Sequence, residues 1–184
     1  METPSANVGE AAPRPGRREA WALLVPLALT VVVYARTLPG PLVFDDVAAI
    51  ADNPAIKDLG RFLSDRLLPE LLGGGRVLTD FTFALNYAVG RLEPLGYHLV
   101  NLAIHLGVVA LVYLLTARVA LLAGAARERA LALAVAGTFA LHPIQTEAVA
   151  YVVQRAESLA SGLYVAVLLL LMAAERHGTT RRGA

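Results

Sequence analysis

Four long apolar stretches alternate with polar connections along the chain. A helix that spans a membrane needs about 20 mostly apolar residues, and each stretch approaches that length with few polar interruptions. The stretches cover residues 20–38, 97–122, 130–142 and 159–174. The third is the shortest: it crosses a bilayer that is locally thin, or it forms a buried or re-entrant helix. The pattern predicts an all-α membrane protein with about four transmembrane helices.

The connection between the first two stretches, residues 39–96, is long and has a pattern of its own. From Ile56 to Leu72, apolar residues recur at spacings of three or four, which is typical of one face of a helix. Residues 77–92 also separate apolar from polar positions, and the glycines at 73–75 divide the two pieces. Amphipathic helices of this kind lie in the plane of a membrane interface. We therefore predict a long first loop that contains two amphipathic helices.

Composition supports a membrane protein and excludes several other classes. Of the 184 residues, 57% are hydrophobic and 17% are charged, whereas a soluble domain has roughly 45–50% apolar and about 25% charged residues. A net charge of +1 without a basic stripe disfavours nucleic acid as a partner. The chain has no cysteine, so it contains neither disulfides nor a thiol nucleophile. The sequence motifs of phosphate loops, serine hydrolases, zinc proteases and dinucleotide-binding folds are also missing.

The distribution of charge predicts the orientation in the membrane. Lys and Arg accumulate in cytoplasmic loops. Here three arginines lie before the first stretch (14, 17 and 18), three at or after the end of the second (118, 127 and 129), and three after the fourth (176, 181 and 182). Residues 39–96 carry eight acidic and five basic residues. We therefore place residues 39–96 and 143–158 outside, and residues 1–19 (a disordered tail) and 176–184 in the cytoplasm. A cleaved signal peptide over residues 20–35 is the alternative for the first stretch.

Two adjacent acids follow the first apolar stretch at the outer membrane boundary. A carboxylate pair near low dielectric can supply a general base or bind a divalent metal such as Mg or Mn. Asp45 and Asp46 are therefore candidate catalytic and metal-binding residues. The alternative is that they only cap a helix or a solvated turn.

Three polar residues share one face of the second apolar stretch. His98, Asn101 and His105 are spaced by three and four residues, which places them on one side of a helix. Polar side chains in membrane bundles commonly bond to neighbouring helices. We favour that interpretation for Asn101 and His105, and we keep His98 as a candidate binding residue.

The second outer loop carries a further set of ionisable residues. The set consists of His142, Glu147, Arg155 and Glu157. From Glu147 to Arg155 the spacing predicts a short interfacial helix, and Arg155 and Glu157 stand where the fourth stretch re-enters the membrane. An arginine beside an acid can bind an anion, or the two can form an ion pair at the interface. Because both outer loops carry acids at one membrane face, we predict a site there.

Several motifs, in this order and spacing, resemble a known family. They are Phe44-Asp45-Asp46, Arg76-Val77-Leu78-Thr79, Phe83-Ala84-Leu85-Asn86-Tyr87, residues 96–102, residues 140–149 (ALHPIQTEAV) and Gln154-Arg155-Ala156-Glu157. Together they are similar to the N-terminal membrane part of the transmembrane-and-TPR protein O-mannosyltransferases and their bacterial relatives, which are GT-C type glycosyltransferases. The resemblance covers residues 20–175, and the block at 140–149 is its most specific part.

The resemblance implies a reaction and roles for the candidate residues. Such enzymes transfer a sugar from a polyprenyl-phosphate-linked donor to an acceptor on the outer face of the membrane. Asp45 and Asp46 match the family's acidic motif, where a general base or a metal contact is expected. His98 is kept as a donor-site candidate, and the second-loop set would bind donor phosphate, metal or acceptor. The Ala, Leu, Arg and Gly bias suggests a bacterial cytoplasmic (inner) membrane.

Three functions are compatible with these observations. The first is a membrane glycosyltransferase, or its N-terminal fragment, which further helices or partner membrane subunits complete, because family members have about twice as many helices. The second is a non-catalytic remnant or assembly subunit. The third, a small transporter, is disfavoured because the acids lie at the outer surface and not at the bilayer midplane, where transporter sites lie.

Overall fold

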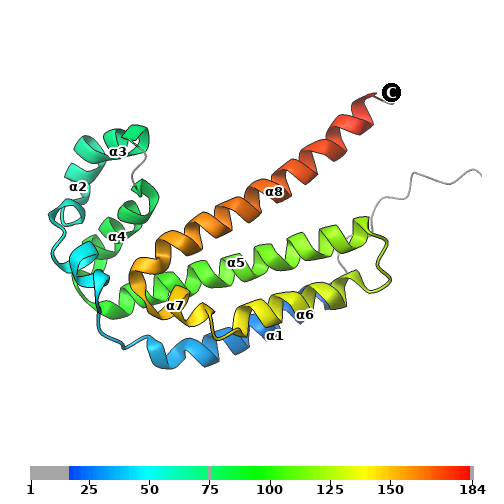
Figure 1. The fold of residues 1–184 in the computed structure, drawn as a ribbon, viewed down its shortest axis with the longest axis horizontal. Helices are drawn as coiled ribbons and strands as arrows, with labels where there is room; N and C mark the ends of the chain where they lie inside the picture. The colour runs from blue at the N-terminus through cyan, green and yellow to red at the C-terminus, as the bar shows by residue number, and fades with distance from the viewer. Residues whose placement is uncertain (1–16, 74–75, 183–184) are drawn as a thin grey trace, which may run out of the picture.

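The computed structural model describes residues 17–73 and 76–182, and every regular element within these ranges is helical. The prediction of an all-α chain is therefore confirmed for this part. Most of the predicted disordered tail, residues 1–16, lies outside the described residues, as do two of the three glycines predicted to divide the loop and the last two residues. Figure 1 shows α1, α5 and α6 running alongside one another, α8 diverging from them towards its end, and a group of shorter helices at one end of the molecule.

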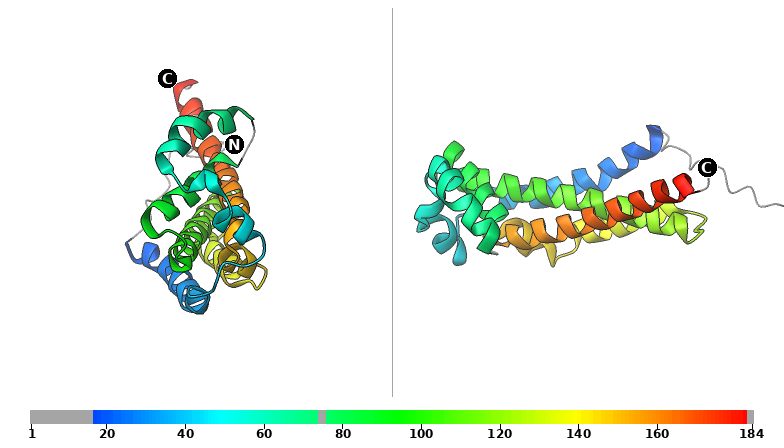
Figure 2. Two further views of the ribbon diagram at one scale, coloured as in Figure 1. Left: turned by 90° about the vertical axis from the view of Figure 1, so that its left-hand side faces the viewer. Right: turned by 90° about the horizontal axis from the view of Figure 1, so that it is seen from above.

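The four long helices form what we call the bundle. They are α1 (Arg17–Tyr34), α5 (Pro94–Leu122), α6 (Glu128–Leu141) and α8 (Arg155–Arg182). The centre of the bundle is α5, which packs against the other three. In Figure 2 the start of α1, the α5–α6 turn and the end of α8 all lie at the end of the bundle away from the shorter helices. Along each helix the chain therefore crosses from one end of the bundle to the other.

Small residues allow the bundle helices to approach closely. On α6, Ala132, Ala136 and Ala140 recur every four residues and are fully buried, so they form one flat stripe along the helix. Val109 of α5 packs against this stripe. Where α8 meets α5, a side chain at Gly162 would stand 3.1 Å from the Val108 Cγ2 atom. The two backbones are this close only because residue 162 has no side chain.

Residues 38–73 and 76–93 form the second region, which we call the head. Its regular helices are α2 (Leu59–Arg61), α3 (Leu67–Gly73) and α4 (Val77–Gly90). A π-helix at Val47–Ala51 and a 3-10 helix at Pro54–Ile56 precede α2, and a π-helix at Phe62–Arg66 joins α2 directly to α3. The head has a closed apolar core whose fully buried members include Ile50, Ile56, Phe62 and Phe83. Tyr97 of α5 and Val152 complete this core and join the head to the bundle.

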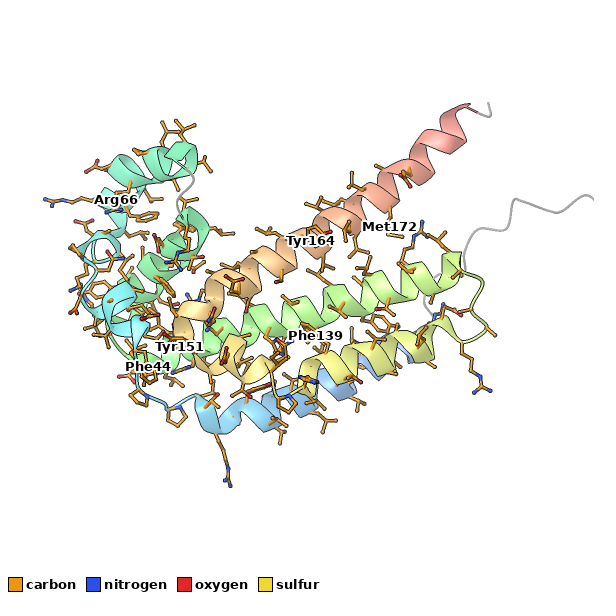
Figure 3. All side chains as sticks on the ribbon, in the orientation of Figure 1. Phe44, Arg66, Phe139, Tyr151, Tyr164 and Met172 are labelled. Carbon is orange, nitrogen blue, oxygen red and sulfur yellow. The ribbon has the colours of Figure 1, made fainter. Side chains whose placement is uncertain are left out.

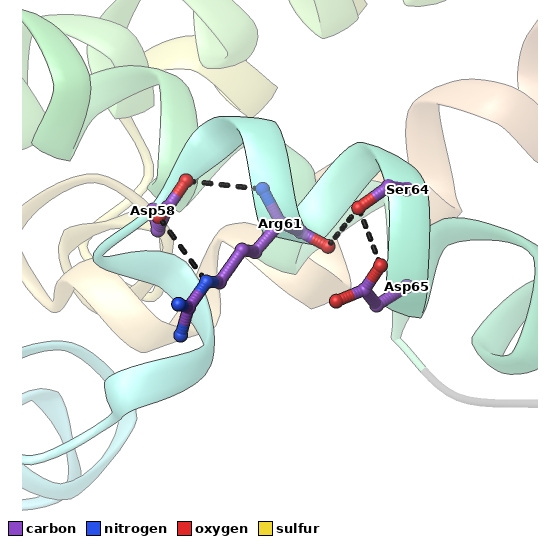
Figure 4. A network of polar contacts seen from close by, with 4 residues as sticks. All are labelled: Asp58, Arg61, Ser64 and Asp65. Carbon is purple, nitrogen blue, oxygen red and sulfur yellow. Dashed lines mark hydrogen bonds and ion pairs between the residues drawn. The ribbon is translucent and has the colours of Figure 1, made fainter.

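The first amphipathic piece of the head forms a helix that runs without interruption from Leu59 to Gly73, so it begins three residues later than its spacing predicts. Asp58 has an extended backbone, and its side chain accepts a hydrogen bond from the Arg61 backbone N–H at 3.0 Å, so it starts a new helix. Ser64 bonds to the Arg61 carbonyl and to the Asp65 carboxylate, and Figure 4 shows these contacts as one surface network. Ile56 and Phe62, on either side of the break at residues 57–58, are both buried in the core of the head.

Two helices, α5 and the segment Val152–Glu175, are long and apolar enough to cross a membrane. Their exposed positions are largely apolar, as at Leu114, Val119, Leu170 and Leu171. Such a surface is unfavourable in water, which distinguishes these helices from the buried core helix of a soluble protein. The helix α6 has 14 residues and spans about 21 Å, less than the ~30 Å hydrocarbon core. Four transmembrane helices therefore remain a prediction.

The boundaries of the second connection differ from those expected. In place of one interfacial helix, the chain forms α7 (Gln145–Ala150) and a turn at Val152–Gln154, separated by an extended Tyr151. The Asn101 side-chain amide donates to the carbonyls of Tyr151 and Val152, which therefore need no helical partner. As a result α8 begins at Arg155, not at residue 159, and it continues to Arg182 through most of the predicted tail.

Candidate functional site

The two adjacent acids lie at the junction of head and bundle, and their environments differ. Asp46 is fully buried, and both of its carboxylate oxygens are engaged: Oδ1 accepts from the Val153 backbone N–H at 2.7 Å and Oδ2 from Val43 N–H at 3.2 Å. The side chain of Asp45 is exposed. Asp46 thus holds the first loop to the second connection, while Asp45 remains accessible at the surface.

An unusual backbone conformation precedes the pair. Phe44 has a φ of 49°, in the left-handed region that a bulky residue rarely adopts. Its side chain is 85% exposed, so burial of the ring does not explain the conformation. Such strain persists only where surrounding contacts impose it, and it occurs often at functional sites. The contacts here are those of Asp46 and of Tyr151, against which the Phe44 ring packs edge to face.

Tyr151 is the second contact of the acid pair with the second connection. Its hydroxyl accepts a hydrogen bond from the Asp45 backbone N–H at 3.1 Å, and Figure 3 shows Phe44 and Tyr151 together where the head meets the bundle. Desolvation raises the pKa of Tyr151, the Asp45 N–H lowers it, and the carboxylates of Asp45 and Asp46 raise it further. The phenol therefore stays protonated at neutral pH and can donate to the Asp45 carboxylate.

Arg155 is fully buried and connects the head to the bundle. Its Nε donates to Asn101 Oδ1 at 2.7 Å, and its Nη2 donates to the Tyr97 carbonyl at 2.9 Å. Its Nη1 donates to Asn86 Oδ1 at 2.8 Å and to Thr82 Oγ1 at 3.1 Å, both on α4.

The same guanidinium packs over aromatic rings. Its carbon lies 4.7 Å from the centre of the Phe83 ring and 5.9 Å from that of Tyr97. Neutral dipoles and ring faces thus stabilise the buried charge of Arg155. The guanidinium is committed to these internal contacts, which position α4, α5 and α8 relative to one another.

The polar face of α5 bonds to neighbouring helices and loops of the protein. Asn101 bonds to Arg155 and to the second connection, and His105 Nε2 bonds to the Ala140 carbonyl at 3.2 Å. The structural interpretation of Asn101 and His105 is confirmed. His98 is also buried; its Nε2 bonds to the Gly40 carbonyl at 3.1 Å, and its Nδ1 has no partner in the described part of the chain.

The other ionisable residues of the second loop remain accessible. His142, Glu147 and Glu157 are all exposed, and His142 Nδ1 accepts from the Ile144 backbone N–H at 3.2 Å. His142 lines an open, mostly apolar groove of about 550 Å³ on α6, together with Val135, Phe139 and Ile144. Glu157 lines a smaller pocket of about 170 Å³ that adjoins this groove, because Phe139 and Gln145 line both. The predicted ion pair of Arg155 and Glu157 is not formed: one side chain is buried and the other exposed.

The acid pair has some, but not all, of the features of a metal-binding site. Within the described residues, no three His, Asp or Glu side chains gather in one place. The backbone hydrogen bonds to Asp46 leave Asp45 as the more available ligand. Mg²⁺ is often bound through only one or two carboxylates, with substrate phosphate and water as its other ligands, so the pair fits an ion of that kind.

Several residues that define this region have no strong signal in the sequence. Thr82, Asn86 and Tyr97 surround Arg155, and Tyr151 contacts Asp45. The spacing of Thr82 and Asn86 shows that they share a helical face, but not what that face contacts. The motifs that contain Asn86 and Tyr97 were part of the resemblance, which was therefore the available signal for those two residues.

Comparisons with known proteins find relatives by sequence. The chain is 37% identical to protein O-mannosyl-transferase TMTC3 of Mus musculus over 159 residues, 79% of this chain and 16% of the relative. It is 38% identical to Drosophila melanogaster Tmtc1 (84% of this chain, 18% of the relative) and 36% identical to Homo sapiens TMTC4 (76% and 21%). The chain thus spans about a fifth of the length of these relatives. No family model matches the chain, and no solved structure does.

Proposed function

Because this chain is a relative of the protein O-mannosyl-transferases TMTC1, TMTC3 and TMTC4, we propose that it performs glycosyl transfer in a membrane, as a GT-C type enzyme or as part of one. The donor is a sugar, in the first instance mannose, linked to a polyprenyl phosphate. The acceptor is a hydroxyl group at the outer membrane face. This reaction agrees with the resemblance of residues 20–175. A membrane location is supported by the relatives and by the two helices that are long and apolar enough to cross a membrane.

The single observation that supports this reaction is the difference in burial and hydrogen bonding between the two acids. Asp46 is buried and engaged by two backbone N–H groups, whereas Asp45 is exposed beside it. In the reaction, the Asp45 carboxylate takes the proton of the acceptor hydroxyl while that oxygen attacks the anomeric carbon of the sugar. The bond to the phosphate oxygen breaks, and the lipid phosphate leaves. Asp46 positions Asp45 for this step.

The remaining candidate residues take two kinds of role. His142, Glu147 and Glu157 are exposed, and we assign them to binding of donor or acceptor. Arg155 and His98 are buried and bonded within the protein, so we assign them to positioning of the two loops. The apolar groove beside His142 supports a donor with a hydrocarbon chain. If a divalent metal takes part, Asp45 holds it together with the donor phosphate, whose charge it would neutralise.

Transfer of labelled mannose in membranes tests the reaction. We expect membranes that contain this chain, given polyprenyl-phosphate mannose and a Ser/Thr-rich peptide, to label the peptide. Asp45→Asn should abolish labelling without changing the amount of protein in the membrane. Asp52→Asn, an exposed acid of the same loop, is the matched control and should retain activity. Full activity of Asp45→Asn would refute the assignment.

The second candidate function is that of a non-catalytic membrane subunit. In this interpretation, partner membrane subunits supply the further helices. Affinity purification in mild detergent should then recover a second membrane protein in fixed ratio. Transfer that appears only when this partner is added would place the chain in a two-component enzyme, whereas activity of the isolated chain would exclude the subunit interpretation.

We also propose that the head faces the outside and that both termini are cytoplasmic, in a bacterial inner membrane. The start of α1, the α5–α6 turn and the end of α8 lie together at one end of the bundle. These segments are basic, and basic segments face the cytoplasm, so their shared location supports this arrangement. The chain has no cysteine, so single cysteines can be introduced cleanly. Val89→Cys, on the exposed face of α4, should react with an impermeant maleimide in intact cells. Ala126→Cys, in the α5–α6 turn, should react only after lysis.

A further inference from the structure

A short apolar surface lies beside Asp45 at the junction of head and bundle. It consists of Val43, Phe44 and Val47, which are 36%, 85% and 41% exposed. We call these three residues the loop tip. Because Asp46 is fully buried, Asp45 is the one polar residue exposed within residues 43–47. The exposed carboxylate therefore has exposed apolar neighbours on both sides along the chain.

Contacts with the second connection fix the height of the loop tip along the bundle. The Phe44 ring packs against the ring of Tyr151, as Figure 3 shows, and the Asp46 carboxylate accepts from the Val153 backbone N–H. The Tyr151 carbonyl in turn accepts from the Asn101 side chain of α5 at 3.4 Å. The loop tip and Asn101 therefore lie at the same level of the bundle.

The membrane-spanning length of the bundle begins at this level. One helix that is long and apolar enough to cross a membrane starts beside the loop tip, at Val152, and ends at Glu175. The other, α5, continues from Asn101 to Leu122. At 1.5 Å per residue both segments rise about 31–36 Å, close to the ~30 Å thickness of the hydrocarbon core of a bilayer. The boundary of that core on the side of the head therefore falls at the loop tip.

The backbone holds the Phe44 ring outward in a strained conformation. Its φ of 49° is unfavourable for a bulky residue, whereas glycine adopts it freely. An aromatic ring that is 85% exposed is also unfavourable in water. A ring held in this way gains free energy only if something apolar covers it. At the boundary of the hydrocarbon core that cover is lipid, into which Phe and Leu side chains of interfacial segments insert.

We infer that the loop tip inserts into the lipid interface on the head side of the bilayer, with the Phe44 ring against the glycerol groups and the upper acyl chains. A bilayer suits this surface better than a protein partner, because three side chains cover far less than the ~800 Å² that each partner buries in a stable protein interface. The inference rests on the membrane location of the bundle and not on the proposed sugar transfer. The loop tip thereby keeps the Asp45 carboxylate at the boundary between lipid and water.

Tryptophan fluorescence of the full chain in bilayers tests the inference. The chain has one tryptophan, Trp21, so Trp21→Phe combined with Phe44→Trp leaves a single reporter at the loop tip. The bilayers are phosphatidylcholine whose acyl chains carry bromine either near the glycerol end or near the methyl end. We expect emission at a shorter wavelength than in water, strong loss of emission with bromine near the glycerol end, weaker loss with bromine near the methyl end, and little loss with aqueous iodide.

The matched control is Val89→Trp in the same Trp21→Phe background. Val89 is an apolar residue of α4 that is 91% exposed. The neighbouring Gly90 carbonyl accepts from the Glu93 backbone N–H, and Glu93 stands eight residues before Asn101. The control therefore lies about 12 Å further from the bilayer than the loop tip. We expect iodide to quench this reporter and brominated lipid to leave it almost unchanged.

Two results would overturn the inference. If iodide quenches the Phe44→Trp reporter as strongly as the Val89→Trp reporter, the loop tip lies in water. If neither iodide nor brominated lipid quenches it, a protein segment covers the ring. The same measurements on a chain that also carries Asp45→Asn should be unchanged, so loss of sugar transfer in that variant does not affect the inference.

A second reporter leaves Phe44 in place, in case its substitution disturbs the junction. The chain has no cysteine, so Val47→Cys gives a single site for a nitroxide spin label. In bilayers we expect this label to collide more often with oxygen, which dissolves in lipid, than with a water-soluble nickel chelate. The label at Val89→Cys should show the opposite preference. A preference for the nickel chelate at both sites would refute insertion of the loop tip.

Discussion

In the head, Ile50, Ile56 and Phe62 are fully buried, whereas in the bundle Val32, Leu114 and Leu170 project outward. The head thus has a closed core like that of a water-soluble domain, although Leu68, Leu71 and Leu72 remain exposed on α3. The bundle has narrow contacts between small residues and a wide apolar exterior, which suits lipid. The difference shows that one chain uses two ways of burying apolar surface: against itself at one end and against a membrane along the rest.

Polar contacts at the junction connect the two regions. Arg155, at the start of α8, bonds to α4 in the head and to α5 in the bundle. Asp46 joins the first loop to the residues just before α8. If the head is a folded domain and the bundle a lipid-supported one, substitutions at the junction should cost the most stability and those at exposed positions the least.

The largest expected effect is that of Arg155→Met. The substitution leaves the buried acceptors of Asn101, Asn86 and Tyr97 without a donor, and each such group costs about 1–3 kcal/mol. We expect the free energy of unfolding to fall by about 3 kcal/mol or more, measured by denaturant titration in detergent. Arg155→Lys should also destabilise, because an ammonium cannot bond in four directions in one plane.

The matched control for this prediction is Arg61→Met in the head. The Arg61 side chain is 83% exposed, and its ion pair with Asp58 is 3.7 Å long, so its loss should change stability by less than about 1 kcal/mol. If both substitutions cost the same, Arg155 does not connect the two regions.

The two acids provide the next comparison. Asp46→Asn leaves one oxygen for two backbone N–H groups, so one of them loses its acceptor, and we expect a loss of about 1–2 kcal/mol. Asp45→Asn should leave the free energy of unfolding unchanged and abolish sugar transfer. Thermal unfolding and the transfer assay on both variants check this. A destabilised Asp45→Asn with a normal Asp46→Asn would reverse the roles of the two acids.

A smaller effect is expected inside the bundle. Gly162→Ala places a methyl group 3.1 Å from Val108 Cγ2, so α8 must shift away from α5, and we expect a loss of about 1 kcal/mol. Gly107→Ala on α5 meets nothing within 4 Å and should be neutral or stabilising by up to ~1 kcal/mol. Melting temperatures of the two variants in the same detergent decide this, and equal melting temperatures would show that the close contact between α8 and α5 is not limiting.

The smallest effect concerns the pH dependence of Tyr151. Because desolvation and the neighbouring carboxylates raise its pKa, its contact with Asp45 is fully present below the ordinary tyrosine pKa and is lost as the pH rises through the raised value. The difference in tyrosinate absorbance between the unmodified chain and Tyr151→Phe should therefore appear above the pH at which free tyrosine titrates. Asp45→Asn should move this titration towards lower pH; an unchanged midpoint would show that the carboxylate does not contact the phenol.

Local patterns in the sequence predicted the long elements well. The second apolar stretch was expected at residues 97–122 and forms α5 at Pro94–Leu122, and the third was expected at 130–142 and forms α6 at Glu128–Leu141. The helix-to-helix role of Asn101 and His105 was also predicted from their spacing. These features depend on helical periodicity, which is a property of neighbouring residues. The relationship to the protein O-mannosyl-transferases was likewise inferred from the motifs, and the sequence identity to these relatives confirms it.

The tertiary structure alone decided what the polar residues at the junction contact. Arg155 was expected to bind an anion or to pair with Glu157, yet its partners are 54 to 73 residues earlier in the chain. Asp45 and Asp46 are equivalent in the sequence, and only the approach of residues 151–153, more than 100 positions away, buries one and exposes the other. The periodicity of a helix specifies which residues share a face, but the packing of distant segments determines what that face meets. The sequence by itself therefore determined the helices and the family, and the folded chain determined which carboxylate is buried and which is exposed.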